Sequence, residues 1–215
     1  MPTIQYKNSK GEKLSGTTTI ISSNLGWSRG ALMYWAWDKG IHGLDYRKVS
    51  EEAADSGTLA HAMIEAELKK KPMPEKDGIP KEIIEKAETA YLNFIEWEER
   101  NQVKPIAIEP HLVSEVYQFG ATPDYIGYVN GKASLLDWKT GGVYEDHLLQ
   151  LAAYKVAWEE VHPETLLDGG FNLIRFSKED AAFDHKFRQS LPEAWEAFLC
   201  ALKLHSLHKV LKKMV

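Results

Sequence analysis

The dipeptide Asn130-Gly131 is the feature that most constrains how this chain can fold. Asn-Gly is the strongest short-range signal for a two-residue β-hairpin turn, because both residues tolerate positive φ in a type I′ turn. The flanking segments, residues 125–129 and 133–139, are rich in apolar and β-branched or aromatic residues and are predicted to be antiparallel strands. Val129 then faces Lys132, and this register, followed away from the turn, places Asp124 directly opposite Asp137.

Two opposed aspartates indicate a metal site at the end of this hairpin. Opposed residues of an antiparallel pair have Cβ atoms roughly 4.5–5.5 Å apart, and like charges at that distance destabilise a sheet. A divalent cation bound by both carboxylates would neutralise them, and Mg²⁺ and Mn²⁺ favour such oxygen ligands. Lys139 projects from the same strand face as Asp137, and the backbone carbonyl of Trp138 is a further candidate ligand. A cation beside such a site can stabilise charge on a phosphate or help to activate a water molecule.

The rest of the chain predicts helices before and after a central sheet. Helical apolar stripes indicate helices over residues 51–70, 81–100, 144–161 and 192–213, and an earlier helix carries Leu32 to Trp37 after a turn or short strand at 16–21. Strands are expected at 106–115, with an interruption at Pro110, at 169–176 and at 182–187. The predicted fold class is α/β (α+β), a central mixed β-sheet flanked by helices, in one domain over residues 1–215 with an N-terminal helical segment.

Composition excludes several other classes of protein. The formal net charge is −5, which argues against bulk electrostatic coating of nucleic acid but allows a local basic groove. Cys200 is the only cysteine, so neither an internal disulfide nor a thiolate metal cage can form. No apolar run is long enough to span a membrane and the N-terminus lacks a signal-peptide core, so a cytoplasmic location is the expectation. Phosphate-loop and His-Glu-x-x-His zinc motifs are absent.

Three tryptophans, Trp27, Trp35 and Trp37, fall within eleven residues. Packing in the core explains such residues most simply. A surface on which nucleic-acid bases stack is the alternative, because aromatic faces provide such platforms.

Four sequence elements together resemble one known family. They are, in chain order, Gly57-Thr58-Leu59-Ala60-His61, Pro123-Asp124, Asp137-Trp138-Lys139 and Gln150-Leu151-Ala152-Ala153-Tyr154. In this order the chain resembles the PD-(D/E)XK nuclease superfamily and, within it, the RecB-like exonuclease branch. The resemblance extends from about Gly16 to Trp158 and implies a restriction-endonuclease-like core.

The resemblance also implies a chemistry and a role for each residue. It implies a DNA nuclease, in particular an exonuclease of recombination, repair or end processing, that uses two Mg²⁺ or Mn²⁺ ions. His61, Asp124 and Asp137 would bind metal, and Lys139 would orient or activate the nucleophilic water. Gln150 and Tyr154 would hold the phosphate backbone or the metal-site geometry. The partner would be DNA with a free end, and a helicase or recombinase could assist.

Each residue also has an alternative interpretation. His61 shares a helix face with Ile64 and Leu68, as a packed core histidine would. Glu115 is either a further acidic participant or an exposed strand residue. For the whole chain, the alternatives are a catalytically inactive nucleic-acid-binding module of the same fold and an unrelated metal-binding or structural protein.

Overall fold

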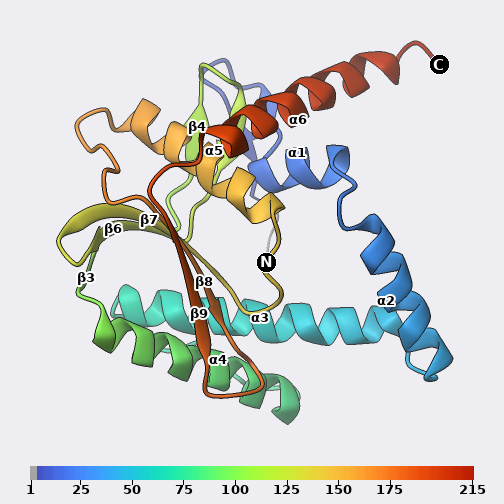
Figure 1. The fold of residues 1–215 in the computed structure, drawn as a ribbon, viewed down its shortest axis with the longest axis vertical. Helices are drawn as coiled ribbons and strands as arrows, with labels where there is room; N and C mark the ends of the chain where they lie inside the picture. The colour runs from blue at the N-terminus through green and yellow to red at the C-terminus, as the bar shows by residue number, and fades with distance from the viewer. Residues whose placement is uncertain (1–3) are drawn as a thin grey trace.

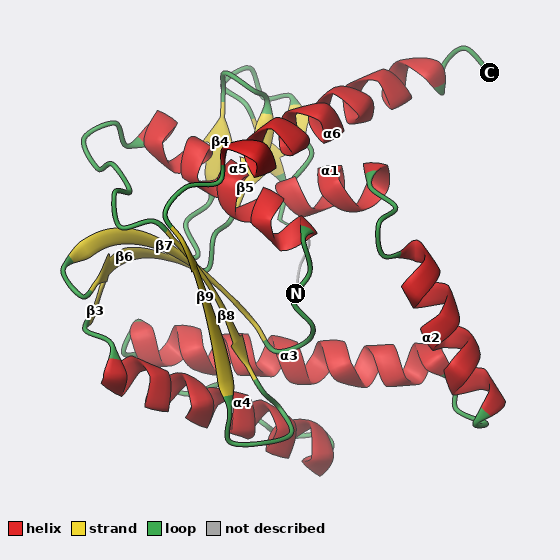
Figure 2. Cartoon of the chain, viewed as in Figure 1, coloured by secondary structure: helices red, strands yellow, loops and turns green. Residues whose placement is uncertain are grey.

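A mixed five-stranded sheet with helices on both faces forms the centre of the computed structural model, which describes residues 4–215 (Figures 1 and 2). The helices are α1 (Thr17–Asn24), α2 (Arg29–Ile41), α3 (Tyr46–Leu68), α4 (Lys81–Arg100), α5 (Asp146–Val161) and α6 (Pro192–Leu211). The strands are β1 (Tyr6–Lys7), β2 (Lys13–Leu14), β3 (Val103–Ile108), β4 (Leu112–Ser114), β5 (Phe119–Ala121), β6 (Tyr125–Val129), β7 (Lys132–Lys139), β8 (Phe171–Phe176) and β9 (Phe183–Arg188). The central sheet has the order β3-β6-β7-β8-β9, which confirms the predicted fold class.

The β6–β7 hairpin forms as its turn predicts. Asn130 and Gly131 have φ of 50° and 82°, the positive values of a type I′ turn. The register runs from Val129–Lys132 to Tyr125–Leu136, as expected. β7 then pairs with β8 in parallel, and α5 makes the crossover connection that parallel neighbours require.

Alternation along β7 separates two apolar cores. Leu135 packs on the face covered by α1, α5 and α6. Leu136 and Trp138 pack on the other face, against α3 and α4. Because successive strand residues point to opposite faces, Asp137 and Lys139 lie on the same side of the sheet as Leu135.

The structure corrects two of the predicted elements. Residues 17–24 form helix α1, where the sequence suggested a turn or short strand. The strand expected over 106–115 is two strands in different sheets, β3 in the central sheet and β4 paired with β5. The chain breaks between them because Glu109 has a positive φ of 51° and Pro110 has no N–H to continue a ladder.

The tryptophans near the N-terminus do not pack in the core. Trp27 and Trp37 are each 57% exposed, so core packing is wrong for both, while Trp35 is half-buried edge-on against Tyr46. α2, on which Trp35 and Trp37 lie, extends at one side of the molecule between α1 and α3 (Figure 1).

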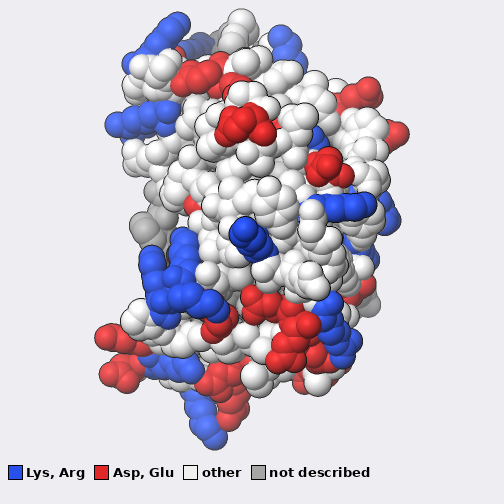
Figure 3. All heavy atoms as spheres, turned by 90° about the vertical axis from the view of Figure 1, so that its left-hand side faces the viewer, with Lys and Arg blue, Asp and Glu red and all other residues white. Residues whose placement is uncertain are grey.

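Charges of both signs are mixed on the surface away from α2. Figure 3 shows basic and acidic side chains interspersed over the lower part of this side. Elsewhere, at the beginning of α4, the ion pairs Lys81–Glu85 and Lys86–Glu82 join residues one helical turn apart. Within residues 4–215 no helix has the length and apolar character needed to cross a membrane.

Candidate active site

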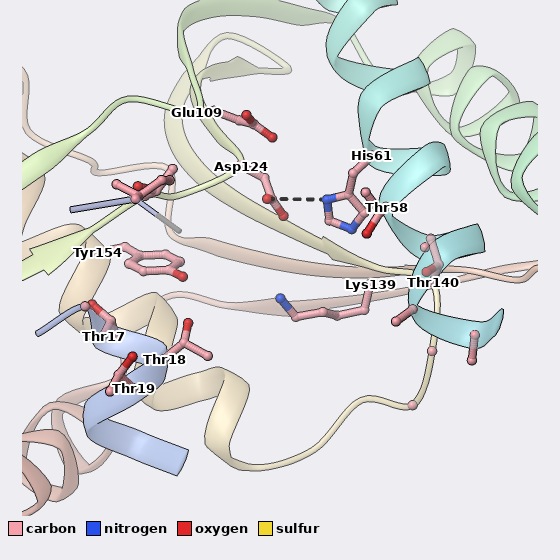
Figure 4. A pocket seen from close by; sticks show the side chains of 18 of the residues that line it. Thr17, Thr18, Thr19, Thr58, His61, Glu109, Asp124, Lys139, Thr140 and Tyr154 are labelled. Carbon is pink, nitrogen blue, oxygen red and sulfur yellow. Dashed lines mark ion pairs between the residues drawn. The ribbon is translucent and has the colours of Figure 1, made fainter. Parts of the chain in front are cut away.

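A cavity of about 770 Å³ lies between α1, α3 and the segment that joins β7 to α5 (Figure 4). Its lining includes His61 from α3, Asp124 before β6, Lys139 at the end of β7 and Tyr154 from α5. These four residues, far apart in sequence, were all predicted site residues. We call this space the main cavity.

Asp124 lies one residue before the β6–β7 ladder begins. The last pair of that ladder is Tyr125–Leu136, so Asp124 and Asp137 are not a ladder pair, although the register points to one. Instead, Asp124 Oδ2 accepts a hydrogen bond from the backbone N–H of Trp138 at 2.9 Å. Its other oxygen lies 3.7 Å from His61 Nδ1, as the dashed line in Figure 4 marks. Asp124 is therefore held on the strand that carries Asp137.

Asp137 and Lys139 form a close ion pair beside Asp124. Lys139 Nζ lies 2.5 Å from Asp137 Oδ2, and the Asp137 side chain is 3% exposed. Apart from this ion pair, Oδ2 has no hydrogen-bond partner among the described residues. The protein's own cations, Lys139 and His61, therefore lie against the two carboxylates.

Burial and mutual charge set the protonation of these groups. Burial raises the pKa of Asp137 to about 6, although Lys139 opposes this shift. Burial also acts to raise the pKa of Asp124, but the charges of His61 and Lys139 and the Trp138 N–H outweigh it and lower that pKa. The two aspartates thus have pKa values pushed in opposite directions.

The two basic groups respond to the same carboxylates. Burial lowers the pKa of His61, but Asp124 raises it by more, and the net shift is upward. The pKa of Lys139 is likewise raised, because Asp137 and Asp124 outweigh the effect of burial. Lys139 is therefore an ammonium group at neutral pH and is poised beside the cavity.

The acidic residues fit a divalent cation in their chemistry. Carboxylate oxygens are the ligands that Mg²⁺ and Mn²⁺ prefer, and among the described residues only Lys139 is paired with the buried Asp137 Oδ2. Among residues 4–215 no three His, Cys, Asp or Glu side chains gather closely enough to make a complete metal site. Lys139 lies where a cation could approach Asp137, so Lys139 would have to move away for Asp137 to bind a metal. The number of ions and the role of the Trp138 carbonyl stay predictions.

Helix α5 brings only one of its two expected residues to the cavity lining. Tyr154 lines the main cavity, and burial raises the pKa of its hydroxyl, which is therefore neutral and can donate a hydrogen bond. Gln150 is buried, and its Oε1 has no hydrogen-bond donor. Gln150 is not among the residues that line the cavity.

Glu109 is a site residue that the sequence analysis missed. It lines the main cavity next to Asp124, and its N–H donates to the Asp124 carbonyl at 3.1 Å. Burial, followed by the carboxylates of Glu65 and Asp124, raises the pKa of Glu109. The available signal was an acidic residue at the end of an apolar strand, directly before Pro110.

Glu115, the acidic candidate suggested by the sequence, lies elsewhere. Its carboxylate accepts the Ser9 N–H at 2.6 Å and does not line the main cavity. Of the two alternatives for Glu115, the structure favours the exposed residue, which lies just after β4 and not at the end of β3.

The first turn of α1 was also missed as part of the site. Thr17, Thr18 and Thr19 line the main cavity opposite His61 (Figure 4). The Thr17 hydroxyl donates to the Gly120 carbonyl at 2.8 Å and anchors this turn to β5. The first N–H groups of a helix lack intrahelical partners and favour negative charge, so this turn suits an anionic group in the cavity.

Comparison with known proteins identifies the family of this chain. The sequence pattern described as the PD-(D/E)XK nuclease superfamily matches residues 25–214. The chain belongs to this superfamily. A crystal structure of an alkaline exonuclease from Laribacter hongkongensis is similar at 15% identity, over 60% of this chain and 73% of that one, with a TM-score of 0.32. No curated protein matches the chain.

Membership of the PD-(D/E)XK superfamily confirms the resemblance at that level. The residues that the sequence analysis assigned to the namesake motif lie close together: Asp124 and Lys139 line the main cavity, and the buried Asp137 pairs with Lys139. The RecB-like branch is a finer assignment and stays a prediction.

Proposed function

We propose that this PD-(D/E)XK nuclease is a metal-dependent deoxyribonuclease of the RecB-like branch, and that it acts as an exonuclease. The observation that carries the proposal is the Lys139 ammonium group placed at the main cavity beside the buried Asp137 and the partly buried Asp124. An ammonium group and two carboxylates whose pKa values are shifted in opposite directions, beside an open cavity, are typical of a functional site. The proposed setting is the cytoplasm, in recombination, repair or end processing, and a helicase or recombinase partner stays a prediction.

Each residue has a role in this proposal. Asp124 and Asp137, with His61, would hold the divalent cation, whose chemistry is to polarise the phosphate and lower the pKa of a bound water. Lys139 orients the attacking water or stabilises the charge that develops on the phosphate. Tyr154 donates its hydroxyl hydrogen to the substrate backbone from the facing helix. Gln150, whose amide oxygen lacks a donor, supports Tyr154 and the metal-site geometry from within α5.

Incubation with end-labelled linear DNA tests the proposal directly. With Mg²⁺ or Mn²⁺ we expect progressive loss of the labelled strand, and with chelator no cleavage. DNA that is bound but stays intact with either metal would instead support the inactive nucleic-acid-binding module. If the protein neither binds nor cleaves the DNA, the remaining alternative is an unrelated metal-binding or structural protein.

A further inference from the structure

Helix α2 is the least covered helix of the described chain. None of its thirteen residues is buried. Large apolar side chains on α2 and just before it are 57–74% exposed, namely Trp27, Leu32, Met33, Tyr34, Trp37 and Ile41. Exposed large apolar side chains gathered in this number on one short segment are typical of a contact with a partner or ligand. We call these six residues the α2 surface.

The α2 surface lies beyond the two helices that wall the main cavity. Thr17–Thr19 at the start of α1 and Ala53–Thr58 of α3 line opposite sides of that cavity. α2 connects the end of α1 to the beginning of α3, so it bridges the ends of both walls (Figure 1). Along α3, Ala53 is seven residues from Tyr46, or about 10 Å at the rise of an α-helix. A chain that leaves the cavity between α1 and α3 therefore meets α2.

A second hollow lies beside the α2 surface. It has a volume of about 480 Å³ and is lined by the end of α1, by Trp27, Arg29 and Leu32, and by Tyr144. The loop that carries Tyr144 also contributes Gly141 and Gly142 to the main cavity. Tyr144 is 55% exposed. Exposed aromatic rings thus continue from the cavity loop to the α2 surface.

The α2 segment carries an excess of basic residues, while the hollow beside it is lined by Arg29 together with Glu145 and Asp146. Residues 25–50 contain four basic residues, Arg29, Lys39, Arg47 and Lys48, and two acidic ones, Asp38 and Asp45. The segment therefore carries two net positive charges within a chain whose net charge is −5. Flat aromatic faces next to basic side chains suit a ligand that combines phosphates with planar rings.

We propose that the α2 surface binds the unpaired bases of single-stranded nucleic acid that extends from the main cavity, with Trp27 and Trp37 as the stacking residues. Bases of an intact duplex are stacked on one another, so only an unpaired strand presents the faces that these rings can contact. This inference rests on the proposed nuclease function, because it takes the main cavity as the place where the strand is cut.

Binding measured in chelator separates this contact from cleavage. The probe is a fluorescent single-stranded oligonucleotide of mixed sequence, and its anisotropy is followed as protein is added. Each stacked base that loses its ring should weaken binding roughly ten-fold to a hundred-fold. We therefore expect the double variant Trp27→Ala/Trp37→Ala to have a Kd for the strand that is higher by at least this factor. The variant Tyr128→Ala, which removes an exposed aromatic ring from β6 in the central sheet, is the matched control and should bind as wild type does.

An abasic oligonucleotide of the same length tests stacking itself. It keeps every phosphate and lacks the bases, so wild type should bind it as weakly as the double variant binds the normal strand. The double variant should not distinguish the two strands. Equal affinity of wild type for both strands, or unchanged affinity of the double variant for the normal strand, would overturn the inference.

Sedimentation and cleavage assays keep the other outcomes apart. If wild type is a dimer and the double variant a monomer with unchanged strand binding, the α2 surface is an interface between copies and the inference is wrong. If wild type cleaves linear DNA but the tryptophan substitutions do not change binding, the stacking inference is wrong and the proposed nuclease function stands. Absence of both cleavage and binding in wild type would overturn the proposed function, and the inference with it.

Discussion

Lys139 is the residue whose side chain links the fold to the proposed chemistry. It sits at the end of a strand buried on both faces, yet its ammonium group reaches the main cavity and pairs with Asp137. Its raised pKa keeps the charge in place, since both aspartates favour the ammonium form. The position of this one charge is therefore set by the sheet and by the carboxylates together.

Replacing Lys139 with alanine should remove cleavage and leave binding of DNA almost unchanged. The ammonium group acts on the reacting groups, and loss of one such charge lowers a rate roughly 10²- to 10³-fold. Initial rates on end-labelled linear DNA measure the effect, and anisotropy in chelator measures binding. Lys132→Ala, on the exposed end of the same strand, is the control and should retain wild-type activity. A Lys139→Ala rate within a few-fold of wild type would remove Lys139 from the mechanism.

Replacing Asp137 with asparagine should separate metal binding from stability. The Asp137 side chain is almost fully buried and lies near a second carboxylate, so its charge opposes folding when no metal is bound. In chelator at neutral pH the variant should melt at the same or a higher temperature than wild type. With Mn²⁺, wild type should gain melting temperature by mass action, and the variant should lose most of that gain.

Melting curves of wild type and Asp137→Asn, recorded in chelator and with Mn²⁺, test whether Asp137 binds the metal. A variant that is clearly less stable in chelator, and that keeps the full response to Mn²⁺, would show that Asp137 has no part in a metal site. It would also show that the ion pair with Lys139 stabilises the fold by more than the burial of the carboxylate costs.

At the scale of elements, the site depends on how the N-terminal segment packs on the β4–β5 pair. The Tyr6 ring lies over Gly120 of β5, and its hydroxyl is 2.8 Å from the Thr122 hydroxyl at the cavity. Gly120 also accepts the hydrogen bond from Thr17 that anchors the first turn of α1. One glycine therefore allows both β1 and α1 to reach the cavity wall.

Gly120→Ala should destabilise the protein through a clash with this ring. A Cβ at position 120 would overlap the ring atoms of Tyr6, and overpacking of this kind costs typically about 1–3 kcal/mol. In the Tyr6→Ala background the ring is absent, so the same substitution should cost little. The free energy of unfolding in denaturant is measured for wild type, each single variant and the double variant, and the four values give the coupling energy between positions 6 and 120. Additive effects of the two substitutions would contradict the packing described.

At the scale of the whole molecule, three helices surround the approach to the site. α1 and α3 form opposite walls of the main cavity, and α2 connects them. The side chains of Asp124, Lys139 and His61 are only 15–22% exposed within it. A free strand end can enter such a site more readily than a continuous duplex, which would have to bend or open first.

A closed circular duplex should therefore resist the enzyme, and the same DNA once linearised should be degraded. Both forms are incubated with Mn²⁺, and the products are followed by gel electrophoresis. Lys139→Ala protein, prepared in the same way, controls for contaminating nucleases. Rapid nicking of the closed circle by wild type alone would indicate an endonuclease, and the site would then have to admit continuous strands.

Local sequence by itself determined the centre of this fold. The Asn130-Gly131 turn fixes the β6–β7 register because positive φ at both residues allows only one hairpin geometry. Strand alternation then places Asp137 and Lys139 on one face. These are short-range consequences of backbone geometry, and they account for the part of the candidate site that could be predicted.

Only the tertiary structure decided which other groups join that site. Glu109 reaches the cavity because the chain turns between β3 and β4, and Lys139 pairs with Asp137 because burial leaves the carboxylate no water. Trp27 and Trp37 have core-forming side chains, yet α2 projects where no other element of the described chain covers them. Burial and long-range contact depend on how distant segments pack together, which periodicity and spacing along a sequence do not encode.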